Sequence, residues 1–117
     1  MNKIAALTLS LIALSMVSPE PAQAATGHEN SCTVININWS PGEVNLVCAS
    51  GSVYVAFLNG SSAAGTCATT DIDTLKAYET LGIAARVSGL VVTVWWDNTC
   101  GSNAVNGIIS SLELKGN

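Results

Sequence analysis

Charged side chains, aromatic rings and histidine are all scarce in this chain of 117 residues. Charged residues make up 10% of the sequence and aromatic residues 5%, and four Lys and Arg stand against eight Asp and Glu. Because phosphate binding needs clustered Lys and Arg, this composition argues against nucleic acid as a partner. The only histidine, His28, lies in a polar stretch in the N-terminal third of the chain, so no Ser-His-Asp or Cys-His arrangement is expected. The sequence therefore predicts no catalytic residues and a protein that is not an enzyme.

Metal and cofactor motifs are missing as well. No CxxC or HxxxH spacing occurs, so we expect no metal site and no cofactor. Asp71 and Asp73 are close enough in sequence to be imagined as an acid and base pair. They are better explained as the acidic start of a helix, where carboxylates meet the positive end of the helix dipole.

The chain has one long apolar run, and it lies at the N-terminus. A short positive segment, residues 1–3, precedes an apolar stretch over residues 4–17 and the small-x-small pattern Ala22-Gln23-Ala24. This order is typical of a cleaved signal peptide over residues 1–24. Residues 25–117 contain no second apolar stretch of spanning length, which predicts a secreted or periplasmic protein with no membrane span.

The exported part is small and contains all four cysteines. Roughly 90 residues form one domain near the lower limit for a single core. An even number of cysteines in a small secreted domain predicts two disulfides, formed by Cys32, Cys48, Cys67 and Cys100.

The stretch from Asp71 to Trp96 reads as a helix followed by a strand. Thr70 or Asp71 suits the N-cap, and Gly89 suits the position just after the helix, where a left-handed conformation is needed. The β-branched run after Gly89 predicts a strand over residues 90–97. The apolar residues of the helix recur at three- and four-residue spacing and share one face: Leu75, Tyr78, Leu81 and Ala85.

The remaining elements are short strands separated by turn residues. Alternation places Ile35, Ile37 and Trp39 on one face of the first strand, and residues 25–31 before it are expected to be loose. One side of the third predicted strand, over residues 52–58, carries Val53, Val55 and Phe57. Strands are predicted over residues 33–39, 44–49, 52–58 and from 105 or 106 to 114, with a loop or a weak edge strand over 61–69.

This element order predicts a mainly β (α+β) protein. We expect a small OB-type β-barrel of five to six antiparallel strands with one long helix before the penultimate strand. A sandwich and a helix-on-sheet layer remain open, because pattern alone does not give strand order.

Several short motifs resemble the B subunits of bacterial toxins that combine one A subunit with five B subunits. The segment A-R-V-S-G-L-V-V-T-V from Ala85, the loop Asn98-Thr99-Cys100-Gly101 and a cysteine just before the first strand are similar to the Shiga toxin B subunit. Trp95-Trp96-Asp97-Asn98 is similar to a loop of cholera toxin B, where a lysine follows in place of Thr99. The tail I-I-S-S-L-E-L resembles the last strand of type II heat-labile enterotoxin B subunits.

The resemblance implies a secreted, non-catalytic lectin that forms a homopentamer, recognises a cell-surface glycan and accompanies a possible catalytic A subunit. It implies a disulfide between Cys32 and Cys100, which leaves Cys48 to pair with Cys67. Because Trp95 and Trp96 alternate along a strand, only one of them can enter the core. By similarity the sugar contacts are Trp96, Asp97 and Asn98, and Asn103 and Trp39 are further candidates.

The helix is apolar on more than one side, with Ala77, Ile83 and Ala84 lying off its main stripe. A monomer needs only one buried stripe, so the excess predicts contact with further copies of the chain. The candidate interface residues are Leu75, Tyr78, Leu81 and Gly82. The rival hypothesis is a secreted or periplasmic module that binds a protein, as an inhibitor or envelope component, without lectin activity.

Overall fold

The computed structural model describes residues 26–115, so the predicted signal peptide over residues 1–24 lies outside the described residues. Within this range, no helix is long and apolar enough to cross a membrane. The described elements, in chain order, are β1 (Thr26–Ser40), β2 (Glu43–Cys48), β3 (Val53–Phe57), the short 3-10 helix η1 (Ser62–Ala64), α2 (Ile72–Ser88), β4 (Val91–Asp97) and β5 (Gly107–Leu114).

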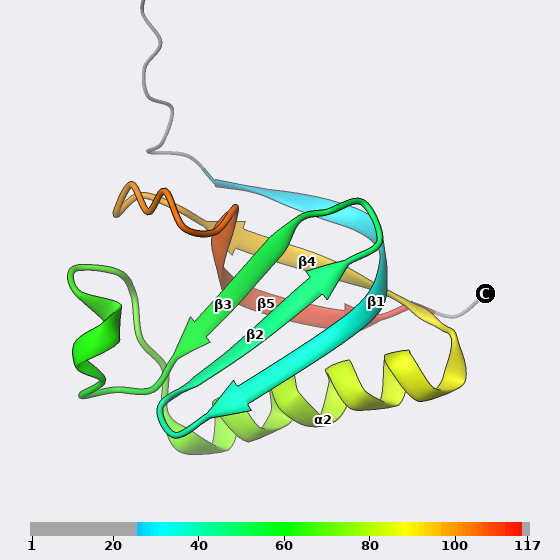
Figure 1. Ribbon diagram of the computed structural model, residues 1–117, viewed down its shortest axis with the longest axis horizontal. Helices are drawn as coiled ribbons and strands as arrows, with labels where there is room; N and C mark the ends of the chain where they lie inside the picture. Colours follow the sequence, from blue (N-terminus) through cyan, green and yellow to red (C-terminus); the bar gives the residue numbers. More distant parts are fainter. Residues whose placement is uncertain (1–25, 116–117) are drawn as a thin grey trace, which may run out of the picture.

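Residues 26–115 fold into a closed barrel in which the strands follow the order β1-β2-β3-β5-β4, and α2 lies along the outside of the barrel (Figure 1). The predicted small barrel with one long helix before the penultimate strand is confirmed. The prediction that all strands are antiparallel is wrong for one pair, because β3 and β5 are parallel. The chain reaches β5 only after passing through α2 and β4, and this crossover brings it back in the direction of β3.

Strand β1 closes the barrel because it bends and pairs on both sides. Its first half pairs with β4 and its second half with β2, and an extra residue interrupts the pairing in each half. One bulge lies between Glu29 and Cys32, and the other lies between Val34 and Asn36, which makes Ile35 the unpaired residue. Bulges of this kind bend a strand and increase its twist.

The bulges correct two predictions about β1. Residues 26–31 are not loose, because they form the half of β1 that pairs with β4. Ile35, Ile37 and Trp39 do not share a buried face: Val34 points into the core, whereas Ile35 is 48% exposed and Trp39 60% exposed. An extra residue inverts the alternation of every side chain that follows it, so a strict period of two fails here.

Helix α2 has the limits that the sequence predicts. It begins after the N-cap Asp71 and ends at Gly89, whose φ of 77° lies in the left-handed region and whose N–H donates to the Ala85 carbonyl. Near the C-terminal end, an Arg86 Nη1 donates to the carbonyl of Ile35, the bulge residue of β1. The helix is thereby held against the strand that closes the barrel.

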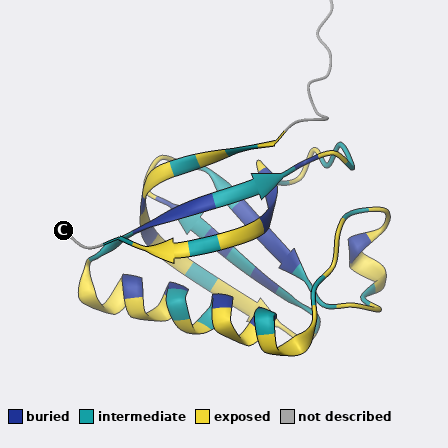
Figure 2. Ribbon diagram, turned by 180° about the vertical axis from the view of Figure 1, so that it is seen from behind, coloured by how far each residue is buried: buried dark blue, intermediate teal, exposed yellow. Residues whose placement is uncertain are grey.

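The inner face of α2 packs on the protomer's own barrel, as the buried stripe along the helix shows (Figure 2). Gly82 lies close to Ile37 and Leu46, so its missing side chain allows the helix to approach the sheet. The buried residues of the helix are Leu75, Tyr78, Gly82 and Ala85. Leu75, Tyr78 and Gly82 are therefore covered by the protomer's own barrel, whereas Leu81 is half-buried. An interface of these four residues with other copies stays a prediction.

The outer face of α2 carries a different apolar set. Ile83 is 44% exposed and Val87 is 81% exposed. The small side chains of Ala77 and Ala84 are also exposed on the helix. We call Ile83, Val87, Ala77 and Ala84 the outer helix face.

Both predicted disulfides form, but the predicted pairing is wrong. Cys32 pairs with Cys48 and Cys67 pairs with Cys100, and no cysteine in residues 26–115 is free. Cys32 lies opposite Val92 at the start of β4, and the strand then runs away from it. From Val92 to Asp97 the strand rise adds roughly 17 Å, which carries Cys100 to the far end of the barrel.

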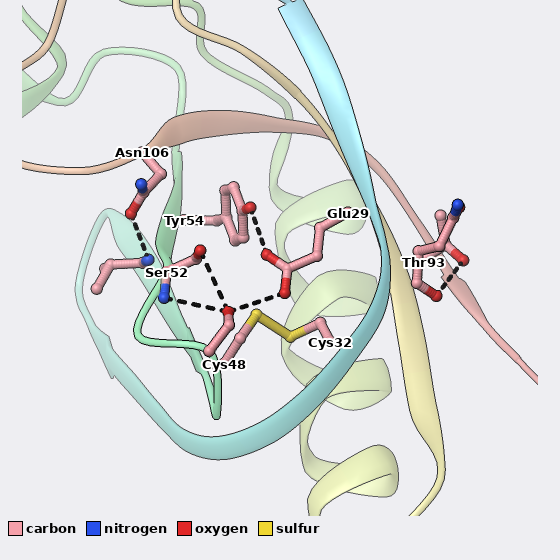
Figure 3. The surroundings of a disulfide bond; sticks show 10 residues. Glu29, Cys32, Cys48, Ser52, Tyr54, Thr93 and Asn106 are labelled. Carbon is pink, nitrogen blue, oxygen red and sulfur yellow. Dashed lines mark hydrogen bonds between the residues drawn. A yellow bond between two sulfur atoms is a disulfide. The ribbon is translucent and has the colours of Figure 1, made fainter.

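A polar network lies beside the Cys32–Cys48 disulfide (Figure 3). The Tyr54 hydroxyl donates to one carboxylate oxygen of Glu29 at 2.7 Å, and the Ser50 hydroxyl donates to the other at 2.9 Å. Burial, together with this hydrogen bond to Glu29, raises the pKa of Tyr54 to about 12. The network ties the first half of β1 to β3 across the end of the barrel.

Removing the two disulfides one at a time is expected to have different structural effects. Chain entropy alone predicts a loss of about 3 to 4 kcal/mol in the free energy of unfolding for either pair. Cys32 and Cys48 are fully buried in the core, so the Cys32→Ala/Cys48→Ala variant also leaves a cavity. Urea unfolding should show the larger loss for this variant. In the Cys67→Ala/Cys100→Ala variant, faster amide hydrogen exchange should be confined to residues 58–71 and 98–106. Equally fast exchange across the whole barrel in both variants would contradict this expectation.

Raising the pH is expected to destabilise the fold through Tyr54. Its pKa is higher in the folded state than the ordinary value of 10.0, so the folded state holds the proton more tightly between pH 10 and about 12. This contribution is present below pH 10 and is lost as the pH rises through that window, at roughly 1.4 kcal/mol per pKa unit. Urea unfolding at pH 9 and pH 11.5 should show this loss, and Tyr54→Phe should weaken the pH dependence. If the free energy of unfolding fell as steeply with pH in Tyr54→Phe as in the native protein, the attribution of the pH dependence to Tyr54 would be contradicted.

Candidate functional site

Two loops project from the end of the barrel that lies away from the Cys32–Cys48 disulfide. The first joins β3 to α2 and contains η1, and the second joins β4 to β5 (Figure 1). The predicted weak edge strand in the first loop is absent within the described residues, apart from one bridge between Leu58 and Thr70. The disulfide Cys67–Cys100 links the two loops, so distant parts of the sequence form one surface.

The β4–β5 loop is organised by Asn98, which is only 7% exposed. Its Oδ1 accepts from the Ser102 N–H at 2.8 Å, and its Nδ2 donates to the Ser102 carbonyl at 3.0 Å. Just before it, the Asp97 carboxylate accepts from the Thr99 N–H at 2.8 Å. This bond holds the pKa of Asp97 below its ordinary value. Both polar atoms of the Asn98 amide are thus engaged within the loop.

The two loops and the outer surface of β2 and β3 enclose a hollow of about 520 Å³, which we call the loop cleft. Val55 forms part of its floor and is buried although it points away from the barrel interior. At its rim, the Asn45 Nδ2 donates to a carboxylate oxygen of Glu43 at 2.7 Å. The walls are formed by residues of the two loops: Ala63, Ala64, Thr66, Cys67, Ser102, Ala104 and Val105.

Trp96 packs with the core rather than outside it. A Cβ atom on Gly27 would lie 2.7 Å from its ring, and one on Gly107 would lie 2.8 Å from its side chain. The two glycines, from β1 and β5, therefore make room for the indole. Trp95 points the other way, and its ring lies 6.2 Å from that of His28 at an angle of 32°. With Asp97 and neighbouring backbone, the two tryptophans line a hollow of about 330 Å³.

Trp39 lies elsewhere, at the end of β1. It lines a third hollow, of about 400 Å³, between the β1–β2 hairpin and the N-terminal half of α2. We call this hollow the Trp39 groove. Ile72 and Leu75 of the helix form its opposite wall. Its polar residues are Ser40, Glu43, Lys76, Glu79 and Thr80.

The structure thus divides the predicted sugar contacts among separate places. Asp97 and Trp96 border one hollow, Asn98 supports the β4–β5 loop, Asn103 is exposed in that loop, and Trp39 borders the groove beside α2. None of the five lines the loop cleft, whose polar residues Glu43 and Asn45 were missed. Both lie on one face of β2 because they are two residues apart, but only the fold shows which loops cover that face. Over the described residues, no cluster of three His, Cys, Asp or Glu could hold a metal ion.

Removing the Asn98 amide is expected to loosen the β4–β5 loop. Asn98→Ala leaves the N–H and C=O of the half-buried Ser102 without their partner, so the free energy of unfolding should fall by about 1 to 3 kcal/mol. Asn103→Ala is the matched control, because Asn103 is exposed in the same loop. This replacement should change the free energy of unfolding by no more than about 0.5 kcal/mol. Urea unfolding of both variants checks this, and equal effects would show that Asn98 does not organise the loop.

Comparison with known proteins gives a likeness in fold. No family model matches the sequence, and no curated protein matches it. Among solved structures, the cholera toxin-like B subunit from Citrobacter freundii superimposes with a TM-score of 0.57 at 16% identity, covering 84% of this chain and 100% of that one.

Two heat-labile enterotoxin structures give similar values. The human enterotoxin in complex with a blood group A antigen analog has a TM-score of 0.56 at 10% identity, covering 78% of this chain and 86% of that one. The porcine Escherichia coli enterotoxin B pentamer in complex with lacto-N-neohexaose has a TM-score of 0.56 at 8% identity, covering 85% of this chain and 100% of that one. The chain described here therefore has the OB-like fold of the B subunits of these toxins.

Proposed function

We propose that this protein is a secreted, non-catalytic glycan-binding subunit of a toxin-like assembly and acts as a homopentamer. The observation that carries the proposal is the fold, shared over most of the chain with toxin B subunits. Two of the similar structures contain bound glycans or glycan analogs, and one is described as a pentamer. The two disulfides are typical of proteins that fold in an oxidising compartment and support export.

The loop cleft supplies suitable chemistry for a sugar. Carboxylate and amide groups accept and donate hydrogen bonds to hydroxyls, and Glu43 and Asn45 offer both at its rim. Phe57, Val53 and Val55 give an apolar floor on which the C–H face of a sugar can rest. Asp97 at the end of β4 and Asn103 in the β4–β5 loop remain predicted contacts, whereas Asn98 supports that loop and Trp96 packs with the core.

The outer helix face supports assembly. Val87 and Ile83 are large apolar side chains left in water by the isolated chain, and Ala77 and Ala84 let another backbone approach closely. A ring that covers this face would bring several sugar sites onto one particle, so weak binding at one site becomes strong binding to a cell surface. A catalytic A subunit is the further partner that such a ring would carry.

The assembly and the lectin activity can be tested in one series. We expect the oxidised protein to have a native mass of about five chains by light scattering. Val87→Glu should lower it to that of a monomer, because an unpaired charge in an apolar interface costs several kcal/mol. Binding to an array of galactose- and sialic-acid-terminated glycans should then fall by at least about tenfold in the variant, through loss of avidity.

Asn103→Glu is the matched control for the mass, because it adds the same charge at an exposed position away from the outer helix face. A monomeric native protein would contradict the ring. A pentamer that binds no glycan on the array would contradict the lectin activity and favour a module that binds a protein partner.

A further inference from the structure

The Trp39 groove combines two large apolar side chains that the fold leaves in water. Trp39 is 60% exposed and Ile72 is 46% exposed, and they come from different elements, the end of β1 and the start of α2. Single exposed apolar residues are common on protein surfaces. Here both lie on the walls of one hollow of about 400 Å³, which is large enough for a small ligand.

The polar residues of the groove are hydrogen-bonding groups that face the same space. Glu43 and Glu79 are half-buried carboxylates, and Thr80 and Lys76 are exposed on the helix. Carboxylates accept hydrogen bonds from pairs of hydroxyls, while the hydroxyl of Thr80 both donates and accepts. An indole beside such groups can stack on the apolar C–H face of a sugar ring while the hydroxyls reach the carboxylates.

The charges decide which sugars fit. Two carboxylates and one ammonium group give the groove a net negative charge, in a chain whose net charge is −4. An anionic sugar such as sialic acid would bring a further carboxylate toward Glu43 and Glu79, and like charges at close distance repel. A neutral saccharide has hydroxyl donors for both carboxylates and meets no such repulsion.

We propose that the Trp39 groove is a binding site for a neutral saccharide, with the Trp39 indole as the stacking surface and Glu79 and Glu43 as hydroxyl acceptors. The site depends on the proposed function in that its ligand is again a sugar, but it lies apart from the loop cleft and from the Trp95–Trp96 hollow. Glu43 borders both the groove and the loop cleft, so the two sites lie on either side of the start of β2.

The three tryptophans allow a direct test by nuclear magnetic resonance on the full oxidised protein. Each indole N–H gives one signal, and Trp39→Phe identifies the signal of Trp39 by its absence. Titration with lactose should shift the Trp39 signal in the native protein, while N-acetylneuraminic acid should need at least about a tenfold higher concentration for the same shift. Trp39→Ala should weaken lactose binding about tenfold or more, and Glu79→Gln by several-fold.

Trp95→Phe is the matched control, since this ring lies at another hollow, beside His28, and lactose should still shift the Trp39 signal. Lactose shifts confined to the other two indoles, or equal binding of the anionic sugar, would overturn the proposal. So would a lower native mass for Trp39→Ala, because the groove would then be covered by a second copy of the chain. If the Trp39→Ala variant still binds the glycan array and lactose does not shift the Trp39 signal of the native protein, this site alone is overturned. A native protein that binds no glycan on the array would instead count against the proposed function.

Discussion

The bend in β1 is the constraint on which the rest of the structure depends. A single strand of 15 residues pairs with β4 along its first half and with β2 along its second, and the two bulges allow it to turn between them. Without the bend, the sheet would stay open and leave unpaired edges. The Cys32–Cys48 disulfide and the hydrogen bonds of Glu29 with Tyr54 and Ser50 all lie at this corner. Arg86 binds the carbonyl of the bulge residue Ile35, so the position of α2 also depends on the bend.

Closure of the barrel determines which face of α2 remains free. Gly82 and the buried residues around it are used against β1 and β2, because the helix lies directly on these strands. Ile83 and Val87 are left outside, and the spacing along the helix already places Ile83 off the buried stripe. A small domain buries a small fraction of its apolar surface. A helix that is apolar on two sides therefore gains further stability only when its second side is covered. The proposed assembly would cover the face that this packing leaves free.

Local signals predicted the fold well, and long-range pairing was where prediction failed. Gly89 and Asp71 mark the ends of α2 because capping depends on a few adjacent residues. The bulge at Ile35 could not be read from the alternating pattern, since it depends on how β1 meets β2 and β4. Cysteine pairing depends equally on which strand ends meet. The rule that Trp95 and Trp96 face opposite sides was right, but only the glycines at positions 27 and 107 show that Trp96 is the inner one. The loop cleft was missed for the same reason, because its rim and its walls come from segments far apart in the sequence.

The two disulfides stabilise different parts of the protein, the core and the surface formed by the two loops. Cys32–Cys48 is buried at the bend, whereas Cys67–Cys100 joins two loops that have few buried apolar residues of their own. Loops of this kind would otherwise lose conformational entropy on binding a ligand, which weakens affinity. In the proposed lectin, the covalent link between the loops would remove part of that entropic cost before a sugar binds. In the proposed lectin, whose sugar contacts would be carboxylate and amide hydrogen bonds and apolar stacking, such preorganisation together with repeated copies would strengthen binding.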